Sequence, residues 1–191
     1  IEGDRFWYAL RGIALPEVPS QKRSIGHSHV LPPALRSESG ALATLHRMLE
    51  KACHRLRMNR YFASHLVLQV KFGFEWPWSH EIRCAPSQDT LNFGKLLDVL
   101  WQTRPQPTPK PTKVSVTLMG LIHASNHTPS LFETPQERQR AKLLQTLDQI
   151  KERYGSRSIY YGNAMLAQKM AEAAPMRIAF NHIPDLTIER D

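Results

Sequence analysis

The sequence predicts an α+β fold in which two helices cover one face of a four-stranded antiparallel sheet, followed by a C-terminal extension of helical and extended segments. The first observation behind this prediction is the order of the patterns along the chain, which is strand, helix, strand, strand, helix, strand. The second is that the three later strands alternate, so that most of their apolar residues lie on one side. At 191 residues, the chain is long enough for one domain with additions.

The first strand and the first helix lie in the front part of the chain. Residues 23–31 form the expected strand, and Ser37 can cap a helix over residues 37–59. Apolar residues recur in this helix at every third or fourth position. The resulting stripe, which we expect to face the sheet, consists of Leu42, Leu45, Leu49, Cys53 and Leu56. His46 lies off the stripe, as do Arg47, Lys51 and Arg55, which we expect to form a solvated face.

The two central strands form a predicted hairpin. Residues 63–72 alternate between apolar and mostly polar side chains, and Lys71 lies on the polar side. A turn around Pro77 leads to a strand over residues 80–85, in which Arg83 faces away from the apolar side. Because these strands are close in the sequence, we expect them to pair with each other.

The second helix and the last strand complete the order. Asp89 can cap a helix over residues 90–104, and a proline-rich connector comes after it. The next strand, over residues 113–122, alternates again, so that Ser115 and Thr117 point away from the apolar side. The four strands and two helices together predict the βαββαβ unit.

Segments outside this unit set the expected domain boundaries. Residues 4–15 predict a short helix, and the prolines after it predict an extended linker. We therefore expect the main domain to span residues 23–125, after a helix end and linker in residues 1–22. Residues 126–191 form the expected extension. Since the chain begins with neither a methionine nor a signal peptide, we expect it to be part of a longer protein.

The extension contains one predicted helix and two extended segments. The helix begins after Thr134, with Pro135 in its first turn, and it ends at Gly155. Residues 158–161 predict a short strand, and residues 176–188 predict an extended segment.

The composition indicates a polyanionic partner. There are 25 Lys and Arg against 17 Asp and Glu, a net charge of +8. Nucleic acid is the commonest partner of so basic a chain, although an ordinary basic surface is the alternative. The two cysteines form neither a disulfide framework nor a zinc knuckle, which indicates reduced thiols in the cytoplasm. No apolar run has the length of about 18 residues that predicts a membrane span.

The predicted polar side of the sheet is the candidate contact surface for that partner. Its occupants are small, hydroxylic or cationic: Ser24, Gly26, Ser28, Lys71, Arg83, Ser115 and Thr117. Hydroxyls and amides donate hydrogen bonds to phosphate, and cations displace its counterions. The surface has few aromatic residues for stacking on bases, so we expect it to bind the backbone of DNA rather than single-stranded RNA.

His27 and His29 raise a competing hypothesis, a metal-dependent nuclease site. Alternate residues of a strand share one face, so the two imidazoles lie together. A zinc site needs three or four converging ligands, however, and the sequence offers neither a second histidine pair nor a nearby acidic cluster. We therefore expect no metal here, with His27 as a surface contact and His29 as its neighbour.

The run from Gly3 to Pro33, which contains the segment KRSIGHSH, resembles the junction of thumb and little finger in Y-family translesion DNA polymerases. The βαββαβ order after this run is that of the little finger. The extension, with the runs SLFE, LLQTLDQIKERYG and SIYYG, resembles the longer, UmuC-like bacterial branch. By this resemblance, residues 1–22 are the end of the thumb and its linker.

This resemblance implies an error-prone polymerase that copies past damaged template, and a little finger that holds primer–template DNA by its backbone. The family's catalytic carboxylates and magnesium ions belong to the palm, so we expect no catalytic residue and no cofactor in this part. Residues 23–26 match the family's opening strand, whose amides and Ser hydroxyl meet template phosphates. The expected DNA contacts are Arg23, Ser24, Gly26, His27, Lys71, Arg83, Ser115 and Thr117.

The UmuC-like branch also carries a sliding-clamp peptide shortly after the fourth strand. Here only its Leu-Phe pair is kept, as Leu131 and Phe132. The pair could plug a pocket of the clamp, or it could anchor a loop on its own domain. The rival to DNA binding is therefore a protein–protein adaptor that docks a clamp or a UmuD-like subunit. Either function places the chain in the bacterial cytoplasm, at the nucleoid, with no membrane partner.

Overall fold

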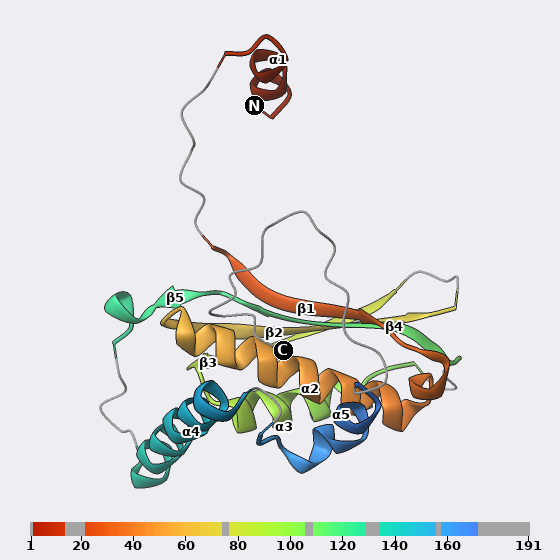
Figure 1. Cartoon of the computed structure of the whole chain (residues 1–191), viewed down its shortest axis with the longest axis vertical. Coiled ribbons are helices and arrows are strands. Elements are labelled where there is room, and N and C mark those ends of the chain that lie inside the picture. Colours follow the sequence, from red (N-terminus) through yellow and green to blue (C-terminus); the bar gives the residue numbers. More distant parts are fainter. Residues whose placement is uncertain are drawn as a thin grey trace.

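A computed structural model of the chain describes residues 2–13, 22–73, 77–105, 109–128, 134–155 and 158–171. The helices and strands are α1 (Glu2–Leu10), β1 (Ser24–Val30), α2 (Glu38–Met58), β2 (Tyr61–Phe72), β3 (Trp78–Ser87), α3 (Thr90–Gln102), β4 (Pro111–Met119), β5 (Ile122–His123), α4 (Pro135–Tyr154) and α5 (Met165–Ala171). Short 3₁₀ turns are η1 (Pro33–Leu35), η2 (Ala124–Asn126) and η3 (Gly162–Ala164). Figure 1 shows α2 and α3 on one face of the sheet, α4 and α5 beyond them, and α1 set apart.

The sheet confirms the predicted α+β fold class. Its strands are ordered β1-β4-β2-β3, and every neighbouring pair is antiparallel. The predicted hairpin is the pair β2 and β3. The strand predicted over residues 113–122 is divided, because Gly120 adopts a positive φ of 63° that turns the chain. Beyond this turn lies β5, a short fifth strand that pairs with the start of β2.

The core lies between the sheet and the two helices. The predicted α2 stripe is confirmed, since Leu45, Leu49, Cys53 and Leu56 are buried and Leu42 packs against them. On α3, Phe93 and Leu97 are fully buried against the apolar side of the sheet. Ser37 caps α2 by accepting from the amide of Gly40, and Asp89 caps α3 by accepting from the amide of Leu91, both as predicted. None of the described helices is long and apolar enough to span a membrane.

The extension packs on the outer side of α2, which corrects one prediction. The Arg and Lys residues off the apolar stripe were expected to be solvated, but the extension covers part of this side, and His46 is only 4% exposed. Its Nε2 lies 2.8 Å from Asp98 Oδ1 on α3, and its Nδ1 accepts from Asn163 Nδ2 of η3 at 2.9 Å. Arg47 also contacts the extension, since its Nε donates to Gln168 Oε1 at 3.0 Å. The outer side of α2 is therefore an interface within the chain.

Ion pairs join α2 to α4. Arg57 binds Asp148 through both carboxylate oxygens, with Nη2 to Oδ1 at 2.8 Å, and His54 Nδ1 lies 2.9 Å from the same Oδ1. Lys151 Nζ lies 3.3 Å from Glu50 Oε2. These charges are partly or largely buried, so removing one partner of a pair would leave an uncompensated buried charge.

The segment predicted as a strand over residues 158–161 forms no strand. The amide of Tyr161 donates to Glu50 Oε1 at 3.0 Å, so a side chain of α2 satisfies it in place of a strand neighbour. The segment leads directly into η3. The extended segment predicted over residues 176–188 lies outside the described residues.

The two thiols are expected to differ in reactivity. Cys53 is 0% exposed, and burial raises the pKa of its thiol to about 12, whereas Cys84 is only partly buried. Because the thiolate is the reactive species, a disulfide reagent at pH 8 should modify Cys84 in the folded chain and reach Cys53 only on unfolding. The measurement is a time course on the Cys84→Ser variant with and without denaturant. Rapid modification of the folded variant would contradict the expectation.

Candidate nucleic-acid interface

The face of the sheet opposite α2 and α3 carries three rows of four side chains, set by the strand register. Each row crosses β1, β4, β2 and β3 in that order. The rows are Ser24, Met119, His65 and Arg83; then Gly26, Thr117, Val67 and Glu81; then Ser28, Ser115, Gln69 and Ser79. A shorter row of Val30, Lys113 and Lys71 ends the face. We call these fifteen positions the open face.

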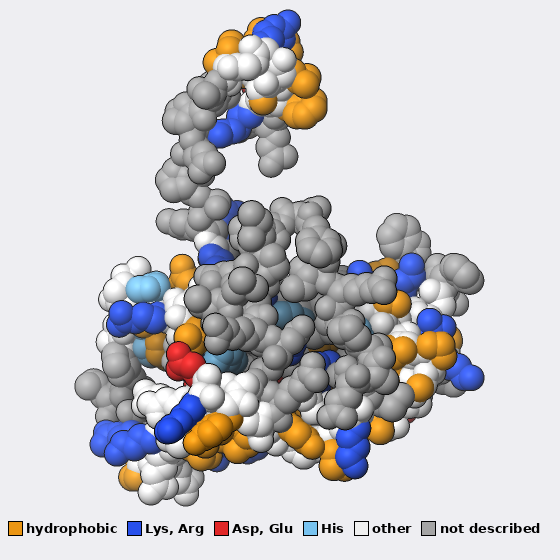
Figure 2. Space-filling view, viewed as in Figure 1, with side chains coloured by type: hydrophobic (Ala, Val, Ile, Leu, Met, Phe, Trp, Pro, Cys, Tyr) orange, Lys and Arg blue, Asp and Glu red, His pale blue; other side chains and the backbone are white. Residues whose placement is uncertain are grey.

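The open face is mostly polar, and its Lys and Arg residues outnumber its carboxylates. Its cations are Lys71, Arg83 and Lys113, all exposed, and its one carboxylate is that of Glu81. Between the cations lie the hydroxyls of Ser24, Ser28, Ser79, Ser115 and Thr117. Hydroxyls interspersed with cations can bind a row of phosphates without reading bases. The described surface in the view of Figure 2 is also basic, because Lys and Arg side chains far outnumber those of Asp and Glu there.

Gly26 has no room for a side chain, because atoms of β4 lie close to it. A Cβ at this position would lie 2.7 Å from Thr117 Oγ1 and 2.9 Å from the carbonyl oxygen of Val116. The hydroxyl could rotate away, but the carbonyl belongs to the sheet backbone. The position therefore requires glycine for packing, and the backbone of β1 stays accessible there.

The structure brings most of the predicted DNA contacts together. Ser24, Gly26, Lys71, Arg83, Ser115 and Thr117 all lie on the open face. Arg23 precedes β1 directly and is exposed. Lys113, which was not among the predicted contacts, also lies on the open face, opposite Lys71 on the neighbouring strand. The alternation of β4 was the signal that could have added it.

His27 is the exception among the predicted contacts, because it lies on the other side of β1. In β1 the exposed side chains are those at even positions, whereas His27 and His29 face the helix layer and are half-buried. Burial, together with Arg55 and Lys51, lowers the pKa of His27 to about 4. Burial, together with Arg47 and Lys51, also lowers the pKa of His29. His27 therefore adds no positive charge to the open face at neutral pH.

The two histidines share a face, as the strand alternation predicted. Within the described part of the chain, however, no group of three His, Cys, Asp or Glu residues lies close enough together to hold a metal ion. The other predicted contact pair, Leu131 and Phe132, lies outside the described residues.

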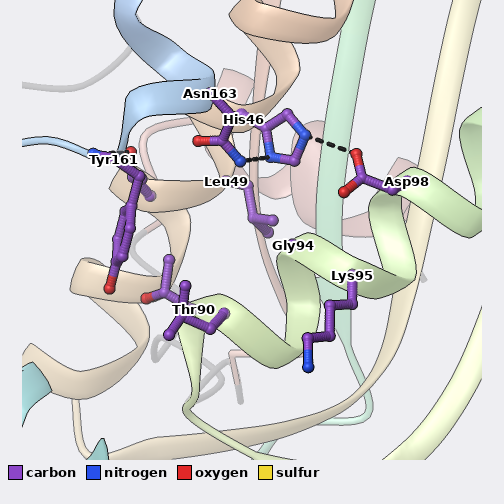
Figure 3. Close-up of a pocket in the computed structure, with 10 residues that line it drawn as sticks. His46, Leu49, Thr90, Gly94, Lys95, Asp98, Tyr161 and Asn163 are labelled. Carbon is purple, nitrogen blue, oxygen red and sulfur yellow. Dashed lines mark hydrogen bonds and ion pairs between the residues drawn. The ribbon is translucent and has the colours of Figure 1, made fainter.

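A pocket of about 140 Å³ is the second place where polar side chains converge (Figure 3). It lies between α2, α3 and η3, with His46 bridging Asp98 and Asn163. Burial raises the pKa of the Glu50 carboxyl, which Lys151 and the Tyr161 amide contact. Because these groups bind one another across the joint between domain and extension, the arrangement is suited to holding the two parts together.

Among solved structures, the chain is similar to the Y-family DNA polymerase chimera Dbh-Dpo4(243-245)-Dbh, with 14% identity and a TM-score of 0.44. The similarity covers 64% of this chain and only 36% of that polymerase chain. No curated protein matches the chain.

The family assignment rests on sequence. The family model described as the impB/mucB/samB family C-terminal domain matches residues 22–131, which is more than half of the chain. The match confirms the predicted likeness to the C-terminal region of Y-family polymerases, while the UmuC-like branch stays a prediction. Residues 22–131 include all four long strands, α2 and α3. The chain therefore belongs to the impB/mucB/samB family, and its residues 22–131 correspond to the C-terminal domain of that family.

Proposed function

We propose that this chain binds primer–template DNA, independently of sequence, as the little finger of an error-prone translesion polymerase. The observation that carries the proposal is the register of β1, β4, β2 and β3, which sets hydroxyls and cations side by side on the open face. Phosphates accept hydrogen bonds from hydroxyls and release counterions to cations. The open face offers no row of aromatic residues for stacking, so contacts to the backbone are favoured over contacts to bases.

The proposal includes the domain boundaries and the wider setting. Residues 23–125 would be the little finger, residues 1–22 the end of the thumb with its linker, and residues 126–191 an extension. Catalytic carboxylates and magnesium would come from another part of the polymerase, as the family resemblance implies. The protein would act in the bacterial cytoplasm, at the nucleoid. A sliding clamp at Leu131 and Phe132, and a UmuD-like subunit, are further proposed partners.

Fluorescence anisotropy with a labelled primer–template duplex tests the proposal. The chain should bind with micromolar affinity at low salt, and unrelated duplex sequences should bind alike. The double variant Arg23→Ala/Arg83→Ala should lose at least tenfold in affinity. The slope of log K against log salt should fall by about 2, because each phosphate contact contributes about 0.9.

The matched control is Lys95→Ala/Lys142→Ala, which removes two exposed cations from α3 and α4 and should change binding less than twofold. Equal losses in the two double variants would mean that net charge alone, and not the open face, binds the DNA. Absence of binding at low salt would favour the adaptor hypothesis, in which the extension docks a protein.

A further inference from the structure

The outer edge of β3 is a regular strand edge that no second described strand covers. β3 ends the strand order β1-β4-β2-β3, and among the described strands it pairs with β2 alone. Proteins commonly block such an edge with a bulge or a proline. In β3 both lie beyond Arg83, because the register with β2 shifts between Arg83 and Ser87, and Pro86 lies in that stretch. Residues 79–83 therefore form an unblocked edge in one register with β2.

The hydrogen-bond pattern of the sheet shows which groups this edge presents. The amide of Leu31 donates to the carbonyl of Thr112 at 2.8 Å, and the two are direct partners when the register of β1 and β4 is continued by one residue. Every second pair of an antiparallel ladder is hydrogen-bonded. Even positions of β4 therefore bond to β1, odd positions of β4 to β2, and even positions of β2 from 66 to 70 to β3. On β3, the backbone groups of Ser79, Glu81 and Arg83 point outward.

The side chains along this edge are complementary to a second copy of themselves. Glu81 and Arg83 occupy successive outward positions and are exposed. In an antiparallel pair with a two-fold axis at Ile82, each Glu81 lies opposite Arg83 of the second copy. An axis at Glu81 or at Arg83 would instead set like charges opposite each other, which destabilises a strand pair. With the axis at Ile82, both charged pairs also exchange two backbone hydrogen bonds each.

The helix above this edge exposes an apolar side chain in the same direction. Thr103 Oγ1 lies 2.8 Å from His80 Nδ1, so this side of α3 lies over β3. Val99 and Leu96 precede Thr103 by four and seven residues and share that side of the helix. Val99 is 54% exposed, and Leu96 is only partly buried. Joining two sheets at β3 would bring the two α3 helices together and cover these side chains.

We infer that the chain forms a symmetric dimer through antiparallel pairing of β3, with the two-fold axis at Ile82. The two sheets then become continuous, and the two open faces lie edge to edge. A second copy is the favoured occupant because the two-fold pairs an acid with a base at both outward positions, and because such a contact closes on itself. Strands of five residues bury little area, so the dimer is weak and forms at about 100 µM and above. The inference does not depend on the proposed DNA binding.

Sedimentation velocity without DNA, over protein concentrations from about 5 to about 500 µM, tests the dimer. The wild type should sediment faster as its concentration rises. Glu81→Arg and Arg83→Glu each set like charges opposite each other and should stay monomeric over this range. The double variant Glu81→Arg/Arg83→Glu restores opposite charges and should dimerise within about threefold of the wild-type Kd. The control is Glu152→Arg, which makes the same charge change at an exposed position of α4 and should dimerise like the wild type.

Disulfide cross-linking tests the register, in a Cys84→Ser background that leaves only the buried Cys53. Ile82→Cys places two thiols across the axis, where the Cα atoms of a pair without mutual hydrogen bonds are about 4.5 Å apart. A disulfide can span this separation, so mild oxidation should yield a covalent dimer. The control Ser79→Cys lies away from the axis and should cross-link about tenfold more slowly.

The outcomes separate this dimer from the proposed DNA binding. A wild type that stays monomeric over the whole range disproves the dimer, whatever its affinity for DNA. A dimer that survives both single charge reversals, or faster cross-linking through Ser79→Cys than through Ile82→Cys, would place the contact elsewhere and overturn the pairing of β3. A dimer with the expected behaviour in a chain that binds no duplex would leave this inference standing and refute the proposed function alone.

Discussion

Replacing Asp148 by alanine is expected to lower the free energy of unfolding by about 3 kcal/mol. The carboxylate receives two hydrogen bonds from Arg57 and lies 2.9 Å from His54 Nδ1. The Arg57 side chain is 13% exposed, so the variant leaves a largely buried guanidinium without its carboxylate. Among the described residues, the carbonyl of Gln88 and the hydroxyl of Thr90 would remain as its acceptors. Removing one member of a buried pair costs more than the pair itself contributes.

Urea denaturation followed by circular dichroism measures this effect. The matched control is Glu152→Ala, which removes an exposed carboxylate one turn further along the same helix and should change stability by no more than about 0.5 kcal/mol. Asp148→Asn keeps an acceptor but loses the charge and should fall between the two. Equal midpoints for the Asp148→Ala and Glu152→Ala variants would show that Asp148 does not hold the extension.

The same carboxylate predicts a dependence of stability on pH. Burial alone would raise the pKa of Asp148, but hydrogen bonds from Arg57 and His54 outweigh it and lower that pKa from 3.8 to about 2. Since the pKa is lower in the folded state, the stabilisation is complete above about pH 4 and disappears as the pH falls toward 2. After allowance for solvent screening, its size is about 1–2 kcal/mol. The Asp148→Ala variant should lack this part of the acid transition.

The open face was predictable because strand alternation is local information. Once residues 63–72 and 113–122 were assigned as strands, the outward positions of Lys71, Ser115 and Thr117 followed from the twofold repeat alone. The same rule places His27 on the helix side of β1, with the buried Ile25, although the family resemblance had included it among the expected DNA contacts. Alternation was the better guide here.

The attachment of the extension could not be read from local pattern. His54 and Asp148 are 94 residues apart, and His46 and Asn163 are 117 apart. On α2, the side chains of Glu50, His54 and Arg57 have the polar character of an ordinary solvated helix face. Only the tertiary fold shows that α4 and η3 supply the complementary groups. Charged positions predict solvent exposure in general, and the rule fails where a second layer carries matching charges.

Replacing Gly26 by alanine is expected to destabilise the fold and weaken DNA binding together. The new Cβ would lie 2.9 Å from the carbonyl oxygen of Val116, which cannot move without shifting β4. Forcing an extra carbon into packed structure costs about 1–3 kcal/mol. A shift of β1 away from β4 would also displace Ser24 and Ser28 from Met119 and Ser115, their neighbours on the open face.

The control for this prediction is Ser28→Ala, which places the same side chain two residues further along the same face of β1. Ser28 already carries a Cβ and is exposed, so stability should change by less than about 0.5 kcal/mol.

Duplex affinity should fall about tenfold in Gly26→Ala, a loss of about 1.4 kcal/mol. A loss of this size is close to that of one hydrogen bond to a charged group. Thermal melting and anisotropy on both variants measure the two effects. A Gly26→Ala variant that melts with the wild type but loses affinity would mean that the added methyl group itself blocks the approach of a phosphate. If it kept both properties, the close contact of β1 with β4 would have no bearing on the open face.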